Sequence, residues 1–198
     1  KNKFDLICAP NHDKDKFRKT DNTIFFEGSI AKVSDSDTDK NTILIAIGGK
    51  NKHYYFDEDY IIAQINYFIS IHPNKNCYIY NSRRTPASTN EKLKSLQDVY
   101  NNIEFLDFNQ GSTDFETALM NASSKLITRD SINMIYESLS CKGKTYLIDM
   151  KKIRSSNKVV KVIDNLIENK KIGFIDCSDI TDGMSKMKLQ KQNIHNEI

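Results

Sequence analysis

At 198 residues, the chain is long enough for one full α/β domain and a fragment of a second. Its 29 basic residues nearly balance its 26 acidic residues, and a net charge of +3 without a long basic run argues against nucleic acid as a partner. No apolar run approaches the length of a membrane span and no signal-peptide pattern is present, so we expect a cytoplasmic protein without a transmembrane segment.

The first part of the chain predicts two short strands followed by a linker. Apolar runs occupy residues 4–9 and 23–26. Residues 34–41 contain no apolar side chain, so they cannot bury enough surface to offset their ordering entropy, and we interpret them as a linker. Because the sequence begins on Lys1 and enters a strand almost at once, we interpret residues 1–33 as the end of an amino-terminal domain whose larger part lies upstream.

From residue 42 onward, apolar runs alternate with segments of helical periodicity. The run at residues 42–47 is continuous, which is typical of a strand covered on both faces of a parallel sheet. Further strands are expected at residues 77–80, 103–106, 125–128, 145–148 and 172–175. Helices are expected at residues 57–71, 88–100, 113–121, 132–141 and 157–168, with a capping box at 88–91. The alternation predicts an α/β, doubly wound parallel sheet over residues 42–176, followed by a polar tail at 177–198 that forms a docking helix or is disordered.

The cysteines and histidines bear on redox compartment and metal binding. Cys8, Cys77, Cys141 and Cys177 are far apart and form no CxxC pair, so they predict no disulfide framework and favour a reducing compartment. Cys8 and Cys77 lie in apolar strand-like runs, where we expect buried thiols. The four histidines are scattered and lack zinc-ligand spacing, so we expect no metal site.

Ligands of an open parallel sheet bind beyond the carboxyl ends of its strands, so candidate residues follow the strands. Gly48 and Gly49 follow the strand at residues 42–47, and two glycines allow a tight turn and a close backbone approach to an anion. A simple turn is the alternative interpretation. The pair is not part of a GxGxxG motif, so the fingerprint of a dinucleotide site is missing.

A basic segment follows the next expected strand. It contains Ser82, Arg83, Arg84 and Thr85. Adjacent guanidinium groups at the edge of a sheet suit a phosphate or carboxylate, because arginine binds these groups in a bidentate way. The alternative is that either arginine forms only a surface ion pair.

A third candidate segment follows the strand at residues 125–128. Asp130 or Ser131 would cap the next helix, whose amino end favours an anion through its free amides and its dipole. Asn133 and Glu137 are four residues apart and therefore share one helical face. The carboxylate of Glu137 could accept two hydrogen bonds from the hydroxyls of a ribose. A capped helix with one solvated glutamate is the alternative.

His12 and Asp13 are the candidates for catalysis. They follow the expected strand at residues 4–9, where His12 could orient a ligand or act as a base with Asp13 beside it. A loop pair without a chemical role fits the sequence equally well. The chain offers no Ser/His/Asp set in addition.

Four segments together resemble the mitochondrial-fission Elm family, over residues 5 to about 176. They are DLICAPNHD (5–13), IGGK (47–50), SRRTP (82–86) and DSINMIYE (130–137). That family looks like GT-B glycosyltransferases, so the resemblance implies a Rossmann-like carboxyl-terminal domain of a GT-B-type fold. Its other, acceptor-side domain is then expected in a missing segment or a separate chain.

More distantly, residues 129–137 are similar to the segment of the peptidoglycan GlcNAc-transferase family in which a helix amino end meets the diphosphate. This similarity implies that Glu137 binds the ribose, that Asp130 and Ser131 lie beside the diphosphate, and that Gly48 and Gly49 face the cleft. Arg129 departs from the pattern of the mitochondrial-fission Elm family, whose members commonly have a small residue at this position.

The resemblance implies transfer of a sugar from a nucleoside diphosphate sugar, of the UDP type, to an unknown acceptor. It implies no cofactor. An acceptor at the membrane surface is one of the options. In GT-B enzymes the catalytic base often comes from the other domain, so nucleotide-sugar binding is better supported than turnover. Two alternatives stay open. The chain could be a non-catalytic interaction module, as the organelle-division role of the family's eukaryotic members suggests, or an inactive truncated remnant.

Overall fold

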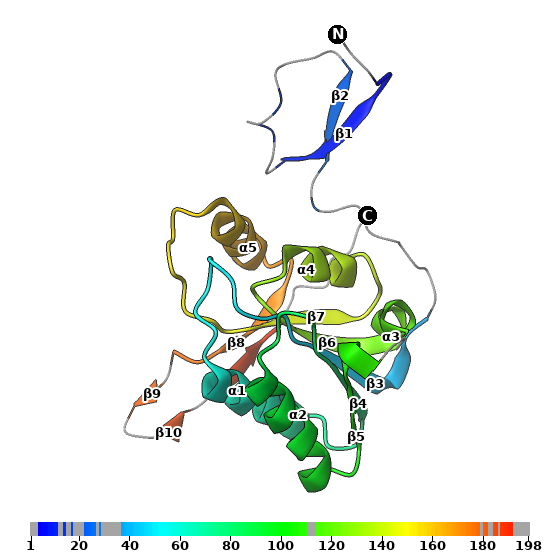
Figure 1. The fold of residues 1–198 in the computed structure, drawn as a ribbon, viewed down its shortest axis with the longest axis vertical. Helices are drawn as coiled ribbons and strands as arrows, with labels where there is room; N and C mark the ends of the chain where they lie inside the picture. Colours follow the sequence, from blue (N-terminus) through cyan, green and yellow to red (C-terminus); the bar gives the residue numbers. More distant parts are fainter. Residues whose placement is uncertain are drawn as a thin grey trace.

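The computed structural model describes residues 4–11, 14, 17, 22–26, 28, 37–110, 114–178, 180–181, 184–185 and 187–191. Within these ranges, the main feature is a seven-stranded sheet with helices on both faces (Figure 1). Its strands are β3 (Asp39–Ala46), β4 (Asn76–Tyr80), β5 (Ile103–Leu106), β6 (Ala122–Thr128), β7 (Lys144–Ile148), β8 (Gly173–Asp176) and β11 (Lys188–Gln190). The helices are α1 (Glu58–Ser70), α2 (Ala87–Val99), α3 (Phe115–Asn121), α4 (Ile132–Leu139) and α5 (Lys158–Glu168).

The strand order β11-β8-β7-β6-β3-β4-β5 is that of a doubly wound sheet with an added edge strand. The strands from β8 to β5 are parallel, whereas β11 runs antiparallel to β8. The chain winds outward from β3 to β5, returns to the centre at β6, and then winds the other way to β8. As a result α1 and α2 cover one face while α3, α4 and α5 cover the other (Figure 1). The direction of winding reverses between β3 and β6, so the topological switch point lies at the carboxyl ends of these two strands.

The core of the sheet comes from continuous apolar runs. Residues 43–47, in β3 and just after it, are at most 1% exposed, as expected for a central strand covered on both faces. Helix α5 buries Val160, Ile163 and Leu166, whose spacing of three places them on one helical face. Burying an aliphatic side chain of this size stabilises the fold by roughly 1.5–3 kcal/mol relative to leaving it exposed. The expected α/β class and doubly wound sheet are confirmed.

The helices begin in different ways. Asp57 caps α1 by accepting a hydrogen bond from the Tyr60 N–H (3.1 Å). The expected capping box at residues 88–91 is wrong, because α2 begins one residue earlier, at Ala87, with Pro86 as its N-cap. The fixed φ of proline suits the start of a helix, where the N–H that proline lacks has no helical acceptor. The Ser88 hydroxyl instead donates to Glu58 (2.8 Å) and joins α2 to α1.

None of the helices in the described ranges is long and apolar enough to cross a bilayer.

The polar tail adds strands where we expected a helix or disorder. Strand β11 pairs with β8 so that Leu189 lies opposite Ile175. Met187 and Leu189 pack against the core while Lys188 and Gln190 are exposed, which is the period-two alternation of an edge strand. This alternation is too short to recognise without knowing that the edge of β8 is available. The tail also contains the antiparallel pair β9 (Ile180–Thr181) and β10 (Met184–Ser185).

A second, two-stranded parallel sheet precedes the main one. It consists of β1 (Ile7–Pro10) and β2 (Thr23–Phe26), and Figure 1 draws it apart from the main sheet. Cys8 is exposed there, contrary to the buried thiol we expected, because a sheet of two strands covers little of its own surface. Cys77, in the main sheet, is buried as expected. Strand β3 begins at Asp39, within the segment interpreted as a linker.

Candidate functional site

The two glycines after β3 lie against the end of β6, at the switch point of the sheet. The Gly48 N–H donates to the Thr128 hydroxyl (2.8 Å), and the Gly49 N–H donates to Asp130 Oδ2 (2.9 Å). A Cβ at Gly48 would lie 2.2 Å from Asp130 Oδ2, and one at Gly49 would lie 2.0 Å from the Arg84 carbonyl oxygen. Glycine is therefore required at both positions by close approach, since neither residue has a positive φ.

Asp130 holds the turn together from inside the protein. Its side chain has no exposed surface, and Oδ2 forms an ion pair with the Arg84 guanidinium (2.8 Å), which is 45% exposed. The same oxygen accepts the Gly49 N–H, while Oδ1 has no hydrogen-bond partner in the described part of the chain. Asp130 thus positions the glycine loop and Arg84.

The hydroxyls of the basic segment also stabilise the glycine loop. Ser82 Oγ donates to the Gly48 carbonyl oxygen (3.0 Å), and Thr85 Oγ1 donates to the Ile47 carbonyl oxygen (3.2 Å). The Ser82 N–H in turn donates to Thr85 Oγ1 (2.9 Å). Thr85 is buried, so its contacts are with the protein, whereas Ser82 also reaches the cavity described next.

A cavity of about 1040 Å³ opens between the ends of β3 and β4 and one side of α4. Its polar wall brings together Ser82, Arg83, Arg84, Ser131 and Glu137, which the sequence had placed in two separate segments. Its other lining residues are Ala46, Tyr80, Asn81, Phe108, Phe115 and Met134. Polar groups thus surround an apolar floor, as is usual for sites that bind small molecules.

The charged side chains of Arg83 and Glu137 differ in their exposure within this cavity. Arg83 is exposed, with its guanidinium 5.8 Å from the centre of the Phe108 ring. Glu137 is half-buried, and burial, followed by the negative charge of Glu116, raises the pKa of Glu137 above its ordinary value. Within the described part of the chain, Glu137 has no hydrogen bond or ion pair, so its carboxylate oxygens can accept hydrogen bonds from a ligand.

The amino end of α4 faces a second, smaller cavity of about 490 Å³. Ser131 is the N-cap and its side chain makes no capping hydrogen bond, so this side chain does not occupy the first amides of the helix. The cavity is lined by Lys50, Asn51, Lys52, His53, Arg84, Asp130, Ser131, Ile132 and Asn133. With two lysines, an arginine and a helix amino end, this wall favours an anion.

His53 belongs to this wall and was missed in the sequence. Burial, followed by the charge of Lys52, lowers the pKa of His53, so the imidazole is neutral near pH 7. Asn51 sets its position, because Asn51 Oδ1 accepts the N–H groups of His53 (2.6 Å) and Tyr54 (3.0 Å). The only sequence signal would have been the Asn two residues before His53, which is typical of a side-chain-stabilised turn.

The proposed catalytic pair cannot be placed, since His12 and Asp13 lie outside the described residues. Within the described residues, no group of three or more His, Cys, Asp or Glu side chains could hold a metal ion. The candidate site therefore consists of the two cavities that flank the amino end of α4 and share Arg84 and Ser131.

One protein family model, described as mitochondrial fission ELM1, matches residues 1–193. No curated protein matches the chain. The matched residues include every strand from β1 to β11 and both cavities of the candidate site.

Proposed function

The chain belongs to the mitochondrial fission ELM1 family, and we propose that it is the nucleotide-sugar-binding half of a GT-B-like glycosyltransferase. The observation that carries the proposal is the arrangement on α4. Ser131 at its amino end and Glu137 further along line one cavity together with Arg83 and Arg84. At about 1.5 Å of rise per residue, the two positions are about 9 Å apart along the axis, a separation comparable with that between a ribose and its 5′-diphosphate.

Each group would have one role in binding. The Glu137 carboxylate would accept hydrogen bonds from both ribose hydroxyls, because it has no partner among the described residues. The amides and dipole at the amino end of α4, together with the exposed guanidinium groups, would hold the diphosphate. The apolar floor at Phe108, Phe115 and Met134 would lie against the flat surfaces of the nucleoside.

The same groups suit the chemistry of glycosyl transfer. As the bond between the anomeric carbon and the diphosphate oxygen breaks, negative charge grows on the leaving diphosphate, and fixed cations and helix dipoles stabilise that charge. The acceptor hydroxyl would come from a partner domain or chain, whose base would remove its proton. We therefore assign donor binding to this chain and the acceptor to the partner.

Calorimetric titration with UDP and UDP-glucose, with GDP, ADP and CDP for comparison, tests the proposal. We expect Glu137→Gln and Arg83→Ala each to weaken binding of the preferred nucleotide roughly 10- to 100-fold, because each removes a charge-assisted hydrogen bond. Glu91→Gln and Arg154→Ala, at exposed positions outside both cavities, are the matched controls and should leave binding unchanged. The proposal is wrong if the folded chain binds none of these nucleotides, or if Glu137→Gln binds them as well as the unmodified chain does.

A further inference from the structure

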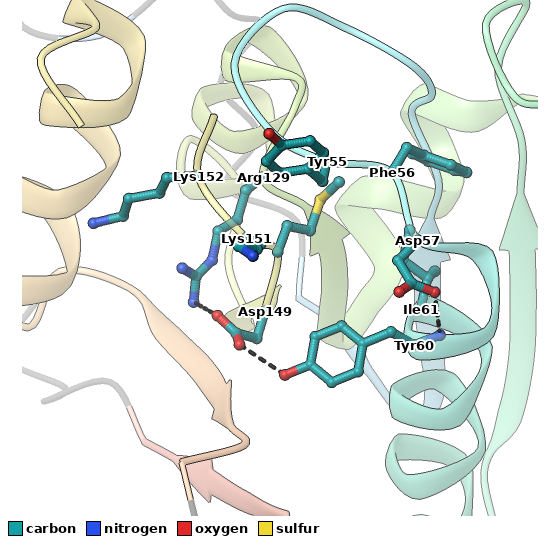
Figure 2. Close-up of a pocket in the computed structure, with 10 residues that line it drawn as sticks. Tyr55, Phe56, Asp57, Tyr60, Ile61, Arg129, Asp149, Lys151 and Lys152 are labelled. Atoms are coloured by element: carbon teal, nitrogen blue, oxygen red, sulfur yellow. Dashed lines mark hydrogen bonds and ion pairs between the residues drawn. The ribbon is translucent and has the colours of Figure 1, made fainter. Parts of the chain in front are cut away.

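A third cavity lies on the other side of the end of β6. Its volume is about 1000 Å³. The segment before α1, the first turn of α1 and the segment after β7 form its walls (Figure 2). Its polar and aromatic lining includes Tyr55, Asp57, Tyr60, Arg129, Asp149, Lys151 and Lys152. It shares no lining residue with the two cavities of the proposed nucleotide site.

Arg129 is the central polar group of this cavity. Its side chain is only 7% exposed, and Nη2 forms an ion pair with Asp149 Oδ1 (3.0 Å). The buried Nε has no hydrogen-bond partner in the described part of the chain. A guanidinium has five N–H donors, and leaving buried donors unpaired is costly, so such a group is usually satisfied by an acceptor. Arg129 also lines the cavity, so an acceptor bound there can meet those N–H groups of the guanidinium that reach the cavity.

Asp149 cannot satisfy these donors alone. Its second oxygen accepts a hydrogen bond from the Tyr60 hydroxyl (2.8 Å), so Asp149 bridges Arg129 and Tyr60 (Figure 2). Asp57 is also occupied, because it caps α1. The acidic groups of the wall are therefore already bound to protein donors.

The cavity also has a lysine beside an exposed aromatic ring. Lys152 pairs with Asp164 (2.7 Å), whereas Lys151 has no ion pair among the described residues. The Lys151 ammonium lies 5.8 Å from the centre of the Tyr55 ring, and Tyr55 is 54% exposed. A cation and an aromatic surface at the mouth of a cavity, with a buried guanidinium inside, match a ligand that has an anionic group joined to a flat ring.

We propose that this cavity is a second binding site, which takes a small molecule with a phosphate or carboxylate group attached to a planar ring. Arg129 and Lys151 bind the oxyanion, and Tyr55 packs against the ring. The site is independent of the proposed nucleotide site because Arg129 and Asp130, although adjacent in sequence, line different cavities.

The test uses phenyl phosphate and benzoate as probes in NMR titrations of the full chain. Inorganic phosphate and acetate represent their anionic parts, and phenol represents the ring. We expect a ring-bearing anion to bind at least fivefold more tightly than either part, and comparison of the two anions identifies the preferred oxyanion. Lys151→Ala and Tyr55→Ala should each weaken binding at least threefold, whereas Lys94→Ala, at an exposed position on α2, should not. Both lysine substitutions remove one surface charge, so a general charge effect would appear in both.

Two further measurements separate this site from the nucleotide site. Arg129→Lys, checked for folding by circular dichroism, should reduce binding of the ring-bearing anion and leave UDP binding unchanged. Saturating UDP should not displace the probe. The inference is overturned if neither ring-bearing anion binds, if Lys151→Ala and Tyr55→Ala bind as the unmodified chain does, or if UDP competes with the probe.

Discussion

Arg129 and Asp130 illustrate how adjacent residues acquire different roles at the end of one strand. The Arg129 side chain pairs with Asp149 after β7, while the Asp130 side chain pairs with Arg84 after β4. Both side chains are almost fully buried, so each depends on its partner to offset the loss of hydration. The turn at Arg129 and Asp130 is therefore held by ion pairs to two different segments, and the Gly49 N–H of the glycine loop donates to Asp130.

Removing the Asp130 carboxylate should destabilise the protein. Asp130→Ala deprives the Gly49 N–H of its acceptor and Arg84 of its partner, and we expect the free energy of unfolding to fall by about 1–3 kcal/mol. Urea unfolding followed by circular dichroism measures this change. Asp98→Ala, at an exposed position on α2, should change the same quantity by less than about 0.5 kcal/mol. Equal stability of the two variants would show that Asp130 does not hold the turn.

Glu137 should make nucleotide binding depend on pH. Burial raises the pKa of Glu137 above its ordinary value of 4.5, so the carboxylate takes up its proton at a higher pH than an exposed glutamate does. The protonated acid accepts hydrogen bonds less well, and affinity should therefore fall as the pH decreases through this raised pKa. UDP-glucose is the suitable ligand, because its diphosphate has no ionisation between about pH 5 and 7. Glu137→Gln should show weak binding without this pH dependence; an equal slope in both proteins would contradict the assignment.

At the scale of elements, a buried lysine in β6 binds the carboxyl end of α4. Lys125 is fully buried, and its ammonium donates to the carbonyl oxygens of Ser138 (2.8 Å), Cys141 (3.2 Å) and Lys142 (2.7 Å). These carbonyls lie in the last turn of α4 and just beyond it, so the ammonium gives them a charged donor and complements the negative end of the helix dipole. Helix α4 ends at Leu139, and Gly143, at φ 91°, lies in the bend before β7.

Lys125→Met should lower the free energy of unfolding by about 2–4 kcal/mol at pH 7, because three carbonyl groups lose a charged donor while the aliphatic volume is kept. Urea unfolding gives the value. Lys158→Met at the exposed first position of α5 is the control for replacing a lysine by methionine. A loss no larger than that of the control would show that the lysine does not stabilise the end of α4.

The pKa of Lys125 predicts how the stability of the protein depends on pH. Burial lowers the pKa of Lys125 to about 8, below the ordinary 10.5 of the unfolded chain. Between these values the unfolded state binds more protons, so the contribution of Lys125 to the free energy of unfolding rises with pH. The stability difference between the unmodified chain and Lys125→Met should therefore grow from about pH 8 to pH 10. A constant difference over this range would contradict the lowered pKa.

At the scale of the whole molecule, the hydrophobic core is confined to the main sheet and its helices. The core cluster among the described residues begins at Ile43 and ends at Cys177. The pair β1–β2 adds no residue to it, and apolar side chains are exposed both before β1, at Phe4 and Leu6, and in β2, at Ile24. We therefore expect the main sheet and its helices to fold as an independent unit.

A chain that begins at Asp37 should fold on its own. Because no described residue before Ile43 belongs to the core cluster, we expect cooperative unfolding with a midpoint within about 4 °C of the full chain, which corresponds to about 1 kcal/mol at this size. Thermal unfolding by circular dichroism tests this expectation. UDP binding should also persist, since the described residues of the nucleotide site all follow residue 45. A broad, non-cooperative transition would show that residues 1–36 are part of the folding unit.

The sequence by itself determined the local structure and the fold class of the main sheet. Continuous apolar runs such as residues 43–47 and the helical spacing of Val160, Ile163 and Leu166 are properties of neighbouring residues, and they indicate buried strands and amphipathic helices without any tertiary information. Because ligands of such a sheet bind at the carboxyl ends of its strands, the same alternation also placed Gly48 and Arg83 at the edge of the sheet where the two cavities lie.

Only the tertiary structure decided which side chains meet. Glu137 and Arg83 line one cavity, Arg129 and Lys151 line another, and Leu189 pairs with the edge of β8, although each of these contacts joins residues far apart in the chain. Whether a charged side chain binds a ligand or another part of the protein depends on such contacts, because burial and partner charges come from all the elements packed around it. Local sequence patterns therefore specified the sheet and its edge, while packing assigned the individual roles at that edge.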